Sequence, residues 1–197
     1  MNATVLYIIA GYLLLLGVVY IIQERFIFKP EKLAQDFKYV YDIPFKELFF
    51  DAEVGVRING LHFTVPKPLG LVLYFHGNSR SIKGWAKYAK DFLRFKYDVV
   101  LVDYRGFGKS TGKRNEQDML KDMQFVYDTL AVQYAEHHII VYGRSLGSGF
   151  AAKIASDNKP RYLILDAPFF SFRKAIERFL PMLPIRFLLR FHLRTDK

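Results

Sequence analysis

Residues 139–147 read IIVYGRSLG: a short apolar run, then a serine with a glycine two positions to either side. An apolar run that ends at G-x-S-x-G is typical of a buried β-strand that turns sharply into a helix and lifts the serine hydroxyl above the sheet. The pattern therefore predicts Ser145 as a nucleophile and the backbone N–H of Leu146 as one donor of an oxyanion hole. Gly143 and Gly147 would leave room where strand and helix pack closely. The alternative is a phosphate-binding or purely structural turn.

Other apolar runs surround this motif and alternate with segments of helical periodicity. This β-α-β-α alternation predicts an α/β fold with a mostly parallel, doubly wound sheet that has helices on both faces. Before these runs, residues 48–65 predict two antiparallel strands around Gly60. The further strands are expected at residues 71–75, 99–102 and 162–165, and the helices at 82–93, at 115–131 and from 146 onward.

Polar loops follow these strands, at the sheet edge where ligands of open α/β sheets bind. The loop His76-Gly77-Asn78-Ser79 follows the strand that normally supplies the second oxyanion donor, here the N–H of Asn78. His76 and Gly77 are expected to support that loop, and His76 precedes the serine in the chain, against the usual order for a catalytic base. The stretch GKS at 108–110 is no phosphate-binding loop, because residue 103 is Asp where that motif requires Gly.

The composition excludes several kinds of site. The chain has 197 residues, 51% of them hydrophobic, and it contains no cysteine, which rules out a disulfide scaffold, a thiolate metal site and a cysteine nucleophile. We expect no metal and no cofactor. The net charge of +10 suits a solvated surface or one attracted to anionic lipid. No nucleic-acid partner is expected, because no nucleic-acid-binding module accompanies the charge.

The N-terminus carries an uncharged apolar run from Val5 to Ile22. As a helix this run would measure about 27 Å, close to the thickness of a hydrocarbon core. It predicts a single-pass membrane anchor, with the lipid bilayer as a partner. A cleaved signal peptide is the alternative, but the run has no basic residue before it and no A-x-A-like site after it. The positive-inside rule places the following domain on the cytoplasmic side, because Arg25, Lys29 and Lys32 follow the run.

The loops at 76–79, 103–110, 143–147 and 165–168 together resemble those of the α/β-hydrolase superfamily. More narrowly they resemble its membrane-anchored Bem46/ABHD13-like branch of serine aminopeptidase S33-type hydrolases, and QERFIFKP at 23–30 is similar to that branch too. The resemblance implies a carboxylesterase-, lipase- or thioesterase-like enzyme. It would hydrolyse a small acyl or ester substrate, with Ser145 as nucleophile and the amides of Leu146 and Asn78 as oxyanion hole.

The resemblance also implies two further strands, one followed by a catalytic Asp and the other by a catalytic His, and neither is found in this sequence. We therefore expect a hydrolase core without its last two strands, nearly inactive by itself. A shortened gene product or a partial sequence explains this better than a dedicated short protein. Asp166 and His192 are the substitutes that the sequence offers for the missing acid and base. A non-catalytic, membrane-bound binding or scaffold protein is the alternative function.

These observations divide the chain into four parts. Residues 1–22 form the anchor, 23–47 a juxtamembrane linker, 48–171 the incomplete hydrolase core, and 172–197 a cap-like tail. In the tail, Arg186, Arg190 and Arg194 recur at intervals of four, which predicts a basic amphipathic helix from Ile185 that covers the site or lies on anionic lipid. The strand at 162–165 is expected to leave an apolar sheet edge exposed.

Overall fold

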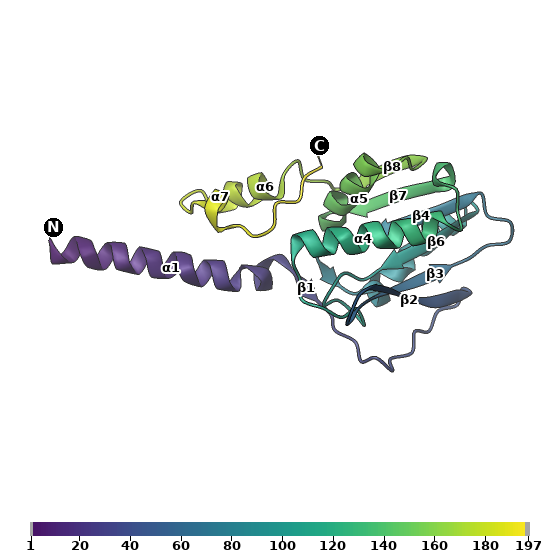
Figure 1. The fold of residues 1–197 in the computed structure, drawn as a ribbon, viewed down its shortest axis with the longest axis horizontal. Helices are drawn as coiled ribbons and strands as arrows, with labels where there is room; N and C mark the ends of the chain where they lie inside the picture. The colour runs from purple at the N-terminus through teal and green to yellow at the C-terminus, as the bar shows by residue number, and fades with distance from the viewer. Residues whose placement is uncertain (1, 196–197) are drawn as a thin grey trace.

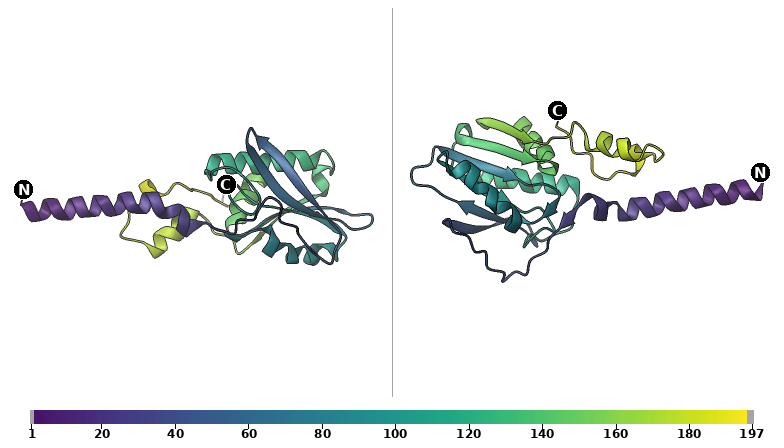
Figure 2. Two further views of the ribbon diagram at one scale, coloured as in Figure 1. Left: turned by 90° about the horizontal axis from the view of Figure 1, so that it is seen from below. Right: turned by 180° about the vertical axis from the view of Figure 1, so that it is seen from behind.

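The structure is a computed structural model that describes residues 2–195, and it contains one α/β unit from which a long N-terminal helix projects (Figure 1). A short two-helix segment at the C-terminal end lies beside that helix, outside the main unit (Figures 1 and 2). The helices are α1 Ala3–Ile27, α2 Ile82–Trp85, α3 Lys90–Leu93, α4 Glu116–Ala131, α5 Leu146–Asp157, α6 Phe172–Phe179 and α7 Ile185–Leu188. The strands are β1 Lys29–Pro30, β2 Phe45–Glu53, β3 Val56–Phe63, β4 Gly70–Phe75, β5 Ser79–Arg80, β6 Tyr97–Val102, β7 Ile139–Arg144 and β8 Tyr162–Asp166.

The main sheet has six strands in the order β2-β3-β6-β4-β7-β8. The last four are mutually parallel, and β3 joins β6 antiparallel. Alternate side chains of β4 and β6 enter two different cores: Leu73 and Val100 pack under α4 and α5, whereas Val72 and Leu101 pack under α2 and α3. The continuous apolar runs of these strands thus reflect burial on both faces, which confirms the doubly wound α/β fold.

The predicted helices at 82–93 and 115–131 are both present. The first is not continuous, because a 3₁₀ turn at Ala86–Ala89 separates α2 from α3. The second begins at Glu116, where the side chain of Asn115 caps it by accepting the N–H of Asp118.

The expected turn at Gly60 is wrong. The hairpin between β2 and β3 turns at Val54 and Gly55, and Gly55 has the positive φ of 77° that such a turn requires. Gly60 lies inside β3, paired with Leu48. A Cβ at Gly60 would lie 3.1 Å from the carbonyl oxygen of Leu101. This glycine therefore serves close packing within the sheet, a role that the sequence does not distinguish from a turn.

Helix α1 is the one helix among the described residues that is long and apolar enough to cross a membrane. It runs to Ile27, past the boundary expected at residue 22. Directly after it, β1 pairs in parallel with β5, and the side chain of Asn78 donates to the carbonyl oxygen of Ile27 at 2.8 Å. The start of the predicted linker is therefore bonded to the loop that follows β4.

The basic amphipathic helix predicted from Ile185 is wrong beyond Leu188, where α7 ends. Leu189 after it is extended, residues 190–193 are irregular, and Arg194 forms a bridge with Ser171. The reason is that side chains from other helices take up the backbone groups that a longer helix would pair internally. Gln23 of α1 bonds the carbonyl of Leu188 and the N–H of Arg190, each at 2.9 Å, and Glu116 of α4 accepts the N–H groups of His192 and Leu193.

Strand β8 has a strand neighbour on one side only within residues 2–195. Its apolar side chains are open to solvent, with Tyr162 57% exposed and Leu163 and Ile164 each 40% exposed. The expected apolar edge is therefore present, and it is a surface at which another strand could pair.

Candidate active site

Ser145 lies between β7 and α5 with φ 50° and ψ −115°. This conformation costs a non-glycine residue on the order of 1–3 kcal/mol, and such strain collects at functional sites. The turn is held by hydrogen bonds of 2.9 Å from Ser145 N–H to the Asp166 carbonyl and from Ser148 N–H to the Ser145 carbonyl. Ser145 is exposed, and its hydroxyl has no hydrogen-bond partner in the part of the chain that the structure describes. The serine is therefore raised above the sheet and is open to a substrate.

The two flanking glycines are required by the packing of this turn. A Cβ at Gly147 would lie 2.1 Å from the carbonyl oxygen of Phe75 in β4, and a Cβ at Gly143 would lie 2.4 Å from the carbonyl oxygen of Gly147. Both obstacles are backbone atoms, which cannot move without shifting the sheet. The predicted packing role of both glycines agrees with this geometry.

Gly147→Ala is expected to lower the free energy of unfolding by about 1–3 kcal/mol, because the added methyl overpacks α5 against β4. Guanidinium unfolding followed by circular dichroism measures it. Gly84→Ala is the control: it is also a helical glycine, but its nearest neighbour is a side-chain carbon of Arg80 at 3.3 Å, which can move. Equal stability of the two variants would contradict the packing argument.

The loop of the proposed second oxyanion donor lies against this turn. Strands β4 and β7 are paired with Phe75 opposite Gly143, so the residues after Phe75 pass beside Ser145. A Cβ at Gly77 would lie 3.8 Å from the carbonyl oxygen of Arg144. The loop is fixed from the other side, because Asn78 accepts the N–H of Lys29 at 2.8 Å. The structure thus brings Asn78, Gly77 and the Ser145 turn together.

His76 is fully buried and holds this loop rather than facing the serine. Its Nδ1 lies 2.6 Å from the Gly77 carbonyl, and its Nε2 lies 3.1 Å from Oδ1 of Asp103. The hydroxyl of Tyr104 donates to the His76 carbonyl at 2.7 Å. Burial raises the pKa of the Asp103 carboxyl, although the hydrogen bond from His76 opposes that shift. Both ring nitrogens of His76 are engaged, which fits the supporting role predicted for it.

Asp166, the sequence's substitute acid, has its carboxylate engaged by two side chains of β7. One oxygen accepts the Tyr142 hydroxyl at 2.6 Å and lies 3.3 Å from the guanidinium of Arg144. Burial, reinforced by the hydrogen bond to Asp166, raises the pKa of the Tyr142 hydroxyl. The Asp166 carboxylate is thereby occupied.

His192, the substitute base, lies in the extended tail beside a small cavity lined by Ser171, Arg173, Lys174 and Arg194. Within residues 2–195, no hydrogen bond or ion pair joins His192 to Ser145 or to Asp166. The structure therefore does not assemble a triad from these residues. No group of three or more acidic or histidine side chains that could hold a metal ion occurs within that range either. That no cofactor takes part stays a prediction.

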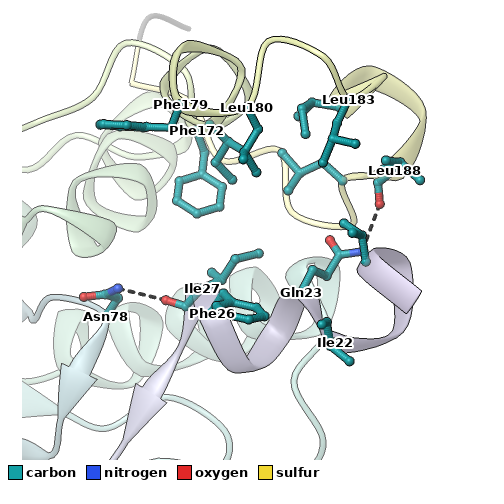
Figure 3. A pocket seen from close by; sticks show the side chains of 14 residues that line it. Ile22, Gln23, Phe26, Ile27, Asn78, Phe172, Phe179, Leu180, Leu183 and Leu188 are labelled. Carbon is teal, nitrogen blue, oxygen red and sulfur yellow. Dashed lines mark hydrogen bonds between the residues drawn. The ribbon is translucent and has the colours of Figure 1, made fainter. Parts of the chain in front are cut away.

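A large apolar pocket beside this site was not foreseen from the sequence. Its volume is about 690 Å³, and it lies between the end of α1 on one side and α6 and α7 on the other (Figure 3). Asn78 lines it, so it adjoins the loop next to Ser145. The sequence indicates an apolar face on α6 through the helical spacing of Phe172, Ile176 and Phe179. It does not indicate that this face lies opposite α1.

Comparison with known proteins identifies a matching family, relatives in sequence and relatives in structure. Residues 66–195 match the family described as serine aminopeptidase, S33. The lysophosphatidylserine lipase ABHD12 of Bos taurus is 32% identical over 111 residues, which cover 53% of this chain and 28% of that protein. Uncharacterized protein R595 of Acanthamoeba polyphaga mimivirus is 32% identical over 120 residues, covering 54% of this chain and 40% of that protein.

Among solved structures, an α/β-hydrolase of Vibrio vulnificus superposes with a TM-score of 0.66 at 22% identity, over 78% of this chain and 58% of that one. The esterase PF2001 of Pyrococcus furiosus superposes with a TM-score of 0.60 at 22% identity, over 82% and 66%. The structural matches establish the fold. The chain spans less than a third of the length of the bovine relative.

Proposed function

Because this chain belongs to the serine aminopeptidase S33 family of α/β-hydrolases, we propose that it is a membrane-anchored serine hydrolase that cleaves acyl esters of lipid-like molecules. The observation that carries the proposal is Ser145 itself, an exposed serine held at φ 50° between a buried strand and a helix. Strained, exposed serines at this position of the fold are the nucleophiles of acyl-transfer enzymes.

The proposed reaction begins when Oγ of Ser145 attacks the ester carbonyl and its proton passes to a histidine. The carbonyl oxygen becomes an oxyanion, which the N–H groups of Leu146 and Asn78 would hold, each worth roughly 3 kcal/mol in comparable sites. Return of the proton releases the alcohol and leaves an acyl-serine, which water then hydrolyses to the free acid. The base is proposed to come from outside residues 2–195, since no histidine in that range is hydrogen-bonded to Ser145. Residues 1–197 by themselves are therefore proposed to be nearly inactive.

The proposed anchor is α1, with the α/β unit on the cytoplasmic side. Apolar side chains cover the helix and are open to solvent in the isolated chain, for example Tyr7 at 78% and Leu14 at 71% exposed. Such a surface is stable only in contact with apolar material. The basic residues Arg25, Lys29 and Lys32 at the end of the helix support the orientation.

Fluorophosphonate labelling in membranes of cells that express the gene from its own locus tests the proposal. We expect covalent labelling of a peptide that contains Ser145, and loss of that label in Ser145→Ala. Ser148→Ala is the matched control, because Ser148 lies one helical turn away with its hydroxyl bonded to the Ser145 carbonyl at 2.6 Å. Absence of label from the unchanged protein would refute the hydrolase proposal and favour the non-catalytic scaffold.

A further inference from the structure

The pocket between α1 and the C-terminal cap, defined as residues 172–193, has walls suited to a hydrocarbon ligand. None of the side chains that line it is charged. Its two polar side chains are both hydrogen-bonded to backbone: Gln23 bonds Leu188 and Arg190, and the Asn78 amide nitrogen donates to Ile27 (Figure 3). A volume of about 690 Å³ lies within the usual range of small-molecule sites. The pocket therefore offers a largely apolar, uncharged surface to a ligand.

One wall of this pocket is the apolar helix itself. Val19, Phe26 and Ile27 of α1 line it, and Leu180 and Leu183 of the cap face them across the gap (Figure 3). The Gln23 bonds described above fix the cap to the helix, and an ion pair between Arg190 and Glu24 at 2.9 Å adds to them. The pocket is thus made jointly by the anchor and the cap.

The cap also carries apolar side chains that face outward. Met182 is 89% exposed and Phe187 is 81% exposed, and neither lines the pocket. The carbonyl of Met182 lies 3.3 Å from the hydroxyl of Tyr12, which places this part of the cap beside the middle of α1. Where α1 is surrounded by lipid, these side chains contact the same lipid. The cap and α1, which together form the pocket walls, would therefore contact the same lipid.

The inner end of the pocket adjoins the proposed chemistry. Asn78 lines the pocket and belongs to the loop that passes beside Ser145. An ester whose carbonyl lies over Ser145 could thus extend its acyl chain along α1. We infer that the pocket between α1 and the cap binds one fatty acyl chain, which enters it directly from the lipid around α1. This inference rests on the proposed function for the ester chemistry, but binding of the chain can be measured without it.

Photocrosslinking of the whole chain in phosphatidylcholine nanodiscs tests the inference, with a diazirine-bearing palmitic acid as the probe and mass spectrometry to map the adducts. We expect adducts on the last turns of α1 and on the cap. Val19→Trp fills the pocket from the anchor side and is expected to lower that yield roughly ten-fold or more. Val18→Trp is the control, because Val18 is the neighbouring residue, is 43% exposed and does not line the pocket.

A second pair tests the opposite wall and guards against a variant that misfolds. Leu180→Trp should lower the yield as Val19→Trp does, and Met182→Trp should leave it unchanged, since Met182 does not line the pocket. Equal yields from the lining and control variants on both walls, or adducts that map elsewhere, would overturn the inference. Fluorophosphonate labelling in membranes of cells that express the gene from its own locus separates the two proposals. No Ser145 label there, with acyl crosslinking to the pocket intact, refutes only the hydrolase, and Ser145 label without acyl crosslinking to the pocket refutes only this inference.

Discussion

Purified residues 1–197 are expected to hydrolyse p-nitrophenyl esters no faster than their own Ser145→Ala variant. A serine hydroxyl is a weak nucleophile without a base, and loss of the triad in comparable enzymes lowers kcat on the order of a million-fold. In this chain both ring nitrogens of His76 are bound to Gly77 and Asp103 inside the core. The backbone N–H of His192 is bound by Glu116 of α4, and within residues 2–195 no hydrogen bond joins His192 to Ser145. Neither histidine is placed to take the Ser145 proton.

Initial rates of ester hydrolysis at several protein concentrations test this expectation. The Ser145→Ala and His192→Ala variants are measured in parallel. The expected result is three indistinguishable rates. A rate that Ser145→Ala abolishes would contradict the expectation, and a rate that His192→Ala also abolishes would identify His192 as the base after rearrangement of the tail. The Ser148→Ala variant controls for damage to the turn.

Arg105→Ala is expected to cost about 3–5 kcal/mol of the free energy of unfolding. Arg105 is 4% exposed, and its guanidinium bonds both carboxylate oxygens of Asp122, at 2.5 and 2.9 Å. It also bonds Glu53 of β2 at 2.9 Å, so it connects α4 to the sheet edge. Removal of the arginine leaves the Asp122 carboxylate buried without its partner. The desolvation of that unpaired charge accounts for most of the expected loss of stability.

Guanidinium unfolding followed by the fluorescence of Trp85, the single tryptophan, measures this cost. The matched control is the double variant Arg105→Met with Asp122→Leu, which removes both charges. It is expected to recover most of the lost stability, because no buried charge remains. A single variant that unfolds at the same denaturant concentration as the unchanged protein would show that Asp122 finds another partner or is protonated at little cost.

Much of the fold could be predicted from the sequence because its signals are local. The apolar runs of β4, β6 and β7 are short and continuous, and strands buried on both faces need that composition. The position of the hairpin turn does not follow from the sequence, because local sequence does not distinguish Gly55 from Gly60. Gly55 takes a positive φ in the turn, whereas Gly60 packs closely against the backbone of Leu101 in β6. That distinction depends on a neighbouring strand.

The tail differs from its predicted helix for a similar reason. Arginines at intervals of four favour a helix, but the side chains of Gln23 and Glu116 take the backbone groups that a helix would use. Gln23 lies 165 residues from Leu188 in the chain. Local periodicity carries no information about such partners, so tertiary hydrogen bonds overrode it.

The sequence by itself determined the turn at Ser145, because a nucleophile turn needs its glycines, its strand and its helix within a few consecutive residues. It also determined that α1 is apolar enough to cross a membrane. Only the tertiary structure decided that His76 is occupied inside the core, that His192 lies apart from Ser145, and that α1 forms one wall of a pocket. These are contacts between segments far apart in the chain, and they follow from how the sheet, the anchor and the cap pack together.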